Sequence, residues 1–117
     1  MKILVVDDER IVLNSCKRVL EAGGFEVFPV TCAQKALTTL EEEQFSLVLI
    51  DVKMPERDGM YLIEEVKKKW PDMPMIVMSG YDIPETIEEA AKIGAPIFIA
   101  KPFTPDELLA KVHQVIG

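Results

Sequence analysis

The chain has 117 residues, of which 49% are hydrophobic and 28% charged, and its formal net charge at pH 7 is −7. A chain of this length and ordinary globular composition predicts one domain over residues 1–117 and argues against a disordered protein. The acidic balance disfavours direct binding to nucleic acid, which draws much of its affinity from Lys and Arg.

The chain begins with a short apolar run at residues 3–6 that acidic residues follow at once. This run is too short for the core of a secretion signal, and no other apolar stretch is long enough to span a membrane. We therefore expect a cytoplasmic protein without membrane association.

Apolar runs and helical spacings alternate along the chain. Short runs typical of buried strands occupy residues 3–6, 25–30, 47–50, 75–78 and 97–99. Apolar residues at helical spacing occupy residues 12–20, 33–40, 63–70, 83–91 and 108–116. Two capping boxes, Thr31 with Gln34 and Thr104 with Glu107, mark helix starts, and Pro105 suits a first helical position.

This alternation predicts an α/β fold with five helices, because each helix returns the chain to begin the next strand in the same direction. Right-handed crossovers with helices on both faces favour a doubly wound, five-stranded parallel sheet. The strand order 2-1-3-4-5, that of flavodoxin-like folds, is one common solution.

Potentially reactive side chains follow four of the five predicted strands. They are Asp7, Asp8 and Glu9 after the first, Asp51 after the third, Ser79 after the fourth, and Lys101 one residue beyond the fifth. In open parallel sheets ligands bind at the carboxyl ends of the strands, so these side chains should converge on one site. Taken singly, each has a simpler explanation: a helix cap, a turn, a loop cap or a solvated charge.

Taken together, the three aspartates Asp7, Asp8 and Asp51 would repel one another unless a cation were bound. A set of oxygen ligands suits Mg²⁺, whereas zinc would need His or Cys. Cys16 and Cys32 lack a CxxC spacing and are expected to be buried free thiols. With the charge neutralised, the central Asp51 could attack phosphorus while Lys101 stabilises the transferred oxygens.

Four segments resemble the receiver domains of bacterial two-component response regulators. These are ILVVDDE at residues 3–9, LIDVKMPERDGM at 49–60, MSG at 78–80 and KPF at 101–103. The resemblance implies that Asp51 is the phosphoacceptor and that Asp8, Asp51 and the backbone carbonyl of Lys53 ligate Mg²⁺, with Asp7 supporting the metal through water. It also implies a cis peptide bond before Pro102.

The same resemblance implies the signalling roles. Lys101 would contact the phosphoryl group, Ser79 would swing toward it, and Phe98 would be the aromatic switch that follows; a core aromatic is the simpler explanation for Phe98. The domain would catalyse its own phosphorylation and dephosphorylation, with a sensor histidine kinase or phosphotransfer protein as donor. A downstream protein or output domain would bind the face formed by the fourth helix, fifth strand and fifth helix.

Three other functions compete with this interpretation. A flavodoxin-like cofactor binder would favour Gly, Ser and Thr after the first strand, where Asp7, Asp8 and Glu9 would repel a phosphate. A haloacid-dehalogenase-like phosphatase would need a second Asp where Glu9 stands. A degenerate receiver would act only as a docking module, although the complete set of acidic, hydroxyl and lysine residues disfavours it.

Overall fold

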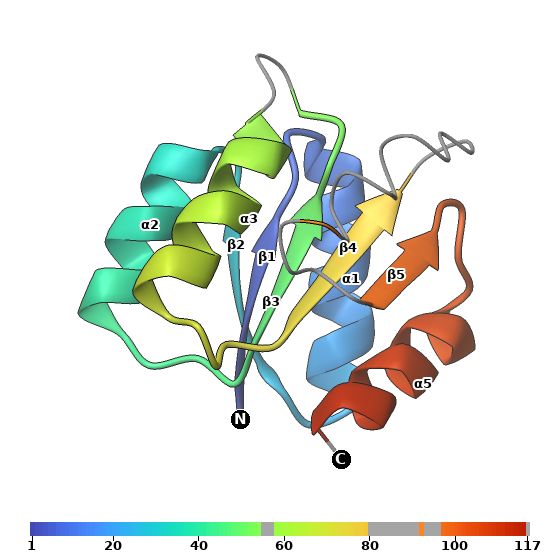
Figure 1. Cartoon of the computed structure of the whole chain (residues 1–117). Coiled ribbons are helices and arrows are strands. Elements are labelled where there is room, and N and C mark those ends of the chain that lie inside the picture. The colour runs from blue at the N-terminus through green and yellow to red at the C-terminus, as the bar shows by residue number, and fades with distance from the viewer. Residues whose placement is uncertain (55–57, 80–91, 93–96, 117) are drawn as a thin grey trace.

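The computed structural model describes residues 1–54, 58–79, 92 and 97–116, and within these it has a five-stranded parallel sheet (Figure 1). The strand order is β2-β1-β3-β4-β5, as predicted. The strands are β1 (Lys2–Val6), β2 (Glu26–Val30), β3 (Leu47–Asp51), β4 (Met75–Ser79) and β5 (Ile97–Ala100). All five residues of the central strand β3 are buried, because helices cover both faces of the sheet.

Two layers of helices enclose the sheet. They are α1 (Arg10–Ala22), α2 (Ala33–Glu42), α3 (Asp58–Lys69) and α5 (Pro105–Ile116). Figure 1 shows α2 and α3 on one face, with α1 and α5 on the other. Alternate strand residues enter separate cores: Leu4 and Val6 pack with α2 and α3, whereas Ile3 and Val5 pack with α1 and α5. The sheet is therefore doubly wound. The helix predicted over residues 83–91 lies outside the described residues.

The predicted helix starts had different outcomes. At α5 the capping box is confirmed: the Thr104 N–H donates to Glu107 Oε1 at 3.0 Å, and the Glu107 N–H donates to Thr104 Oγ1 at 3.1 Å. Pro105 is the first residue of α5. The predicted capping box of Thr31 with Gln34 is wrong. A box with Thr31 as N-cap would start α2 at residue 32, but α2 starts at Ala33, and its N-cap Cys32 makes no side-chain hydrogen bond.

Two further features bear on the sequence predictions. Cys16 is a buried free thiol as expected, whereas Cys32 is free but only half-buried. None of the helices in the described part of the chain combines the length and apolar character that a membrane-spanning segment requires.

Candidate functional site

The site lies at the carboxyl ends of β1 and β3, which are neighbours at the centre of the sheet. Asp51 is the last residue of β3, and Asp7 directly follows β1. Both carboxylates are withdrawn from solvent, with relative exposures of 0% for Asp7 and 2% for Asp51. Two buried negative charges side by side need partners, and the surrounding backbone and one lysine supply them.

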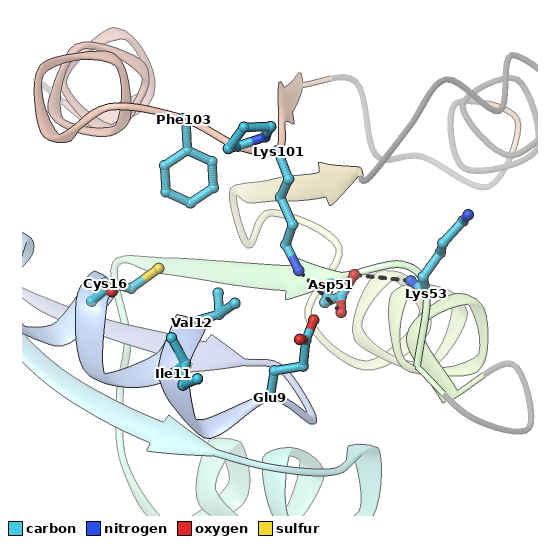
Figure 2. Close-up of a pocket in the computed structure, with 10 residues that line it drawn as sticks. Glu9, Ile11, Val12, Cys16, Asp51, Lys53, Lys101 and Phe103 are labelled. Atoms are coloured by element: carbon cyan, nitrogen blue, oxygen red, sulfur yellow. Dashed lines mark hydrogen bonds and ion pairs between the residues drawn. The ribbon is translucent and has the colours of Figure 1, made fainter.

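Backbone amides hold one oxygen of each carboxylate. The Glu9 N–H donates to Asp7 Oδ1 at 2.9 Å, and the Lys53 N–H donates to Asp51 Oδ1 at 3.0 Å. The other oxygens face Lys101, whose Nζ lies 2.8 Å from Asp7 Oδ2 and 3.3 Å from Asp51 Oδ2. Figure 2 shows the Lys101 side chain reaching across to Asp51, while the Lys53 side chain extends away from it.

Burial and charge perturb the groups of this site. Burial raises the pKa of Asp7, although its hydrogen bond with Lys101 opposes the rise. Burial alone would lower the pKa of Lys101, but the hydrogen bond to Asp7 and the charge of Asp51 outweigh burial and leave this pKa raised. Burial, assisted by the charge of Asp7, raises the pKa of Cys16 to about 11, so this thiol stays protonated at neutral pH.

Four carboxylates gather where one cation could bind them. One oxygen from each of Asp7, Asp8, Glu9 and Asp51 lies within 4.8 Å of the others, and Asp8 and Glu9 are exposed. Lys101 offsets only one of these negative charges. The cluster, as found among the described residues, contains carboxylates and neither His nor Cys. This donor set fits a hard cation such as Mg²⁺ and does not suit zinc.

A cavity of about 590 Å³ opens beside Asp51, between α1 and the connection from β5 to α5 (Figure 2). Its lining residues are Glu9, Ile11, Val12, Ser15, Cys16, Asp51, Lys53, Lys101, Pro102 and Phe103. The α1 residues were not among the sequence predictions. The sequence signal for this wall is that α1 directly follows the acidic end of β1. In the structure Ile11 is 82% exposed and lies off the buried side of α1. The Lys101–Pro102 peptide bond is cis, as the resemblance implied.

The structure brings together Asp7, Asp8, Asp51, Lys101 and the backbone of Lys53. The other two predicted residues lie on neighbouring strands. Ser79 is the last residue of β4 and pairs with Ala100, but its side chain falls outside the described part of the chain. Phe98 lies in β5, is half-buried, and packs against the core that α2 and α3 cover.

This fold is that of a receiver domain, the signalling module of two-component response regulators. Residues 3–113 match the family model of the response regulator receiver domain, and the chain belongs to that family. Among curated relatives it is 36% identical over 113 residues to the response regulator protein FleR of Pseudomonas aeruginosa, covering 97% of this chain and 24% of the relative. It is 35% identical over 115 residues to the transcriptional regulatory protein ZraR of Escherichia coli, covering 98% and 26%.

Solved structures of receiver domain proteins have the same fold as this chain. A CheY-like receiver domain protein from Methanospirillum hungatei superposes with a TM-score of 0.91 at 37% identity, covering 97% of this chain and 90% of that one. NtrX from Brucella abortus gives a TM-score of 0.94 at 32% identity, covering 98% and 26%. The present chain thus spans about a quarter of the length of FleR and ZraR.

Proposed function

We propose that this domain is a phosphoacceptor switch in which Asp51 receives a phosphoryl group from a sensor histidine kinase or phosphotransfer protein. The observation that carries the proposal is the position of Asp51 Oδ2, 3.3 Å from the Lys101 ammonium, within an acidic cluster beside an open cavity. A carboxylate that is held by a backbone amide, faces a cation and borders a cavity is suited to attack an incoming phosphorus atom.

The transfer of the phosphoryl group to Asp51 takes place between the donor's histidine and the side chains of this site. An oxygen of Asp51 forms a bond to phosphorus as the bond from phosphorus to the donor's imidazole nitrogen breaks, and the electron pair of that bond returns to the nitrogen. The product is an acyl phosphate on Asp51. The ammonium of Lys101 neutralises charge on the transferred oxygens. Attack of water on phosphorus later breaks the bond from phosphorus to the Asp51 oxygen, which releases inorganic phosphate and returns the free carboxylate.

The acidic cluster supports a requirement for Mg²⁺. By resemblance to the family, Asp8, Asp51 and the backbone carbonyl of Lys53 would hold the ion, with Asp7 supporting it through water. The three aspartates belong to the observed cluster. When bound, Mg²⁺ would supply positive charge against the phosphoryl oxygens. Asp51 would then present an oxygen to the phosphorus atom while Lys101 contacts the phosphoryl oxygens. Asp7 would anchor Lys101 through its 2.8 Å ion pair.

The signal would pass to a partner through the edge of the sheet. A phosphoryl group adds roughly −1.5 to −2 charges and three acceptor oxygens, which would draw Ser79 toward Asp51 and let Phe98 turn inward. A downstream protein or an output domain would read the face that includes β5 and α5; the predicted fourth helix of this face lies outside the described residues. In this role the domain is a cytoplasmic protein that makes no direct contact with nucleic acid.

The test is intact mass after incubation with a small acyl-phosphate donor, with and without Mg²⁺. We expect the natural chain to gain one phosphoryl group only with Mg²⁺, and Asp51→Ala and the isosteric Asp51→Asn to gain none. Glu42→Gln, which alters a carboxylate at the end of α2, is the matched control and should behave like the natural chain. A folded natural chain that gains nothing would overturn the proposal and identify the domain as a docking module.

A further inference from the structure

Helix α2 is capped by a residue from another helix. Its N-cap residue, Cys32, makes no side-chain cap, and its first amide, the Ala33 N–H, instead donates to Asp58 Oδ2 at 3.1 Å. Asp58 is half-buried and is the first residue of α3, which lies beside α2 on the same face of the sheet (Figure 1). A carboxylate at this position also complements the positive end of the α2 dipole. One hydrogen bond therefore joins the starts of the two helices.

The first turn of α3 also lies directly against the strand end that carries the phosphoacceptor. A Cβ atom built on Gly59 would come within 2.7 Å of the Val52 Cα and 2.8 Å of the Val52 carbonyl oxygen, and would overlap the carbonyl oxygen of Asp51. Such a close approach of backbone to backbone needs glycine. The position of this turn therefore fixes where the backbone of Asp51 and Val52 can lie.

We infer that Asp58 is a positioning residue for the phosphoacceptor site. By fastening the first turn of α3 to α2, it holds that turn against Asp51 and Val52, and so holds the Lys53 amide on Asp51 Oδ1. Loss of the hydrogen bond would let the turn move away from the strand, and the Asp51 carboxylate and Lys53 carbonyl would lose their alignment. The inference rests on the proposed function, since these two groups are the metal ligands proposed there.

Two variants separate the hydrogen bond from the charge. Asp58→Ala and Asp58→Asn remove the same negative charge, but only the asparagine keeps an oxygen that can accept from the Ala33 N–H. By calorimetric titration we expect Asp58→Ala to weaken Mg²⁺ binding about three- to tenfold, which is at or below the usual effect of outer partners of metal ligands. Asp58→Asn should stay within about twofold of the natural chain. Val115→Ala, at the far end of α5, is the control for a general loss of stability.

A second readout needs no metal. Amide hydrogen exchange should quicken at Ala33 and Lys53 in Asp58→Ala, but not in Asp58→Asn. If Asp58→Ala does not fold, Asp58→Glu keeps the charge, displaces the carboxylate by one methylene and should show the same weakening.

Equal weakening in Asp58→Ala and Asp58→Asn would assign the effect to charge and overturn the inference. Unchanged Mg²⁺ affinity with unchanged Lys53 exchange in Asp58→Ala would overturn it as well. A natural chain that binds no Mg²⁺ would instead count against the proposed function, while the exchange experiment would still decide whether Asp58 positions the strand end.

Discussion

Lys101 places one ammonium between two buried carboxylates. Its Nζ lies 2.8 Å from Asp7 Oδ2 and 3.3 Å from Asp51 Oδ2, and its side chain is only 18% exposed. At this burial, water screens the charges poorly, so each carboxylate depends on the lysine when no metal ion is bound. The same residue is therefore a structural counter-ion and, in the proposed function, a ligand for the phosphoryl group.

We predict that Lys101→Met lowers the free energy of unfolding by about 3 kcal/mol at pH 7 in the presence of a chelator, because it leaves Asp7 and Asp51 without a counter-ion. The pKa of Lys101 is raised above its ordinary 10.5, so its stabilisation is complete below that pH and is lost as the pH rises through the raised value. Urea denaturation should therefore show the difference from the natural chain shrinking above pH 10.5. Lys17→Met, on an exposed site of α1, is the control, and a difference that persists at high pH would contradict the prediction.

The first turns of α5 and α2 are capped in different ways, one by residues nearby in the sequence and the other by a distant residue. At α5, Thr104 and Glu107 satisfy each other's backbone amides within four residues. At α2, the corresponding hydrogen bond comes from Asp58, 25 residues away from Ala33. A cap of the first kind contributes to one helix alone, whereas a cap of the second kind also fixes how two helices pack.

We predict that Thr104→Ala costs about 1 kcal/mol of stability, the usual effect of removing an N-cap side chain. The double variant Thr104→Ala with Glu107→Ala should cost less than the sum of the two single variants, because the two hydrogen bonds belong to one box. Urea denaturation of the four chains measures both effects. Thr38→Ala, which removes an exposed hydroxyl in α2, should change little; an unaltered stability of Thr104→Ala would show that the box contributes nothing.

The start of α3 explains why the sequence predicted elements better than their boundaries. Apolar spacing placed this helix from residue 63, but it begins at Asp58 and has Gly59 as its second residue. Glycine disfavours a helix locally, and the contact of Gly59 with the backbone of Asp51 and Val52 overrides that preference. The strands, in contrast, were predicted to within one residue at each end, because a buried parallel strand requires a run of apolar residues that turns interrupt.

At the scale of the whole molecule, topology made the acidic site predictable. Asp7 and Asp8 follow β1 and Asp51 ends β3, and these strands are neighbours in the order 2-1-3-4-5, so the carboxylates meet once the strand order is known. The α1 wall of the cavity depends on how α1 lies against the connection from β5 to α5, and the contact of Asp58 with Ala33 depends on how α2 and α3 pack. The spacing of apolar residues within one segment carries no information on contacts between segments. The sequence analysis therefore predicted neither the cavity wall nor this hydrogen bond.

The acidic site also couples the stability of the whole domain to the metal. An ion that binds only the folded chain raises the free energy of unfolding by about 2.7 kcal/mol when its concentration is a hundredfold above its dissociation constant. We expect this increase in urea denaturation with Mg²⁺ at pH 7.5, and we expect Asp51→Asn to lose most of it. Asp72→Asn, an exposed carboxylate outside the site, should retain it.

The increase should also depend on pH, because protons compete with the metal for the carboxylates. Burial raises the pKa of Asp7 above its ordinary 3.8, so Asp7 takes up a proton at a higher pH than a solvated aspartate would. The stabilisation by Mg²⁺ should therefore be complete at neutral pH and decline as the pH falls through the raised pKa. An equal gain from Mg²⁺ in the natural chain and in Asp51→Asn would show that the ion binds elsewhere on this acidic surface and not at the phosphoacceptor.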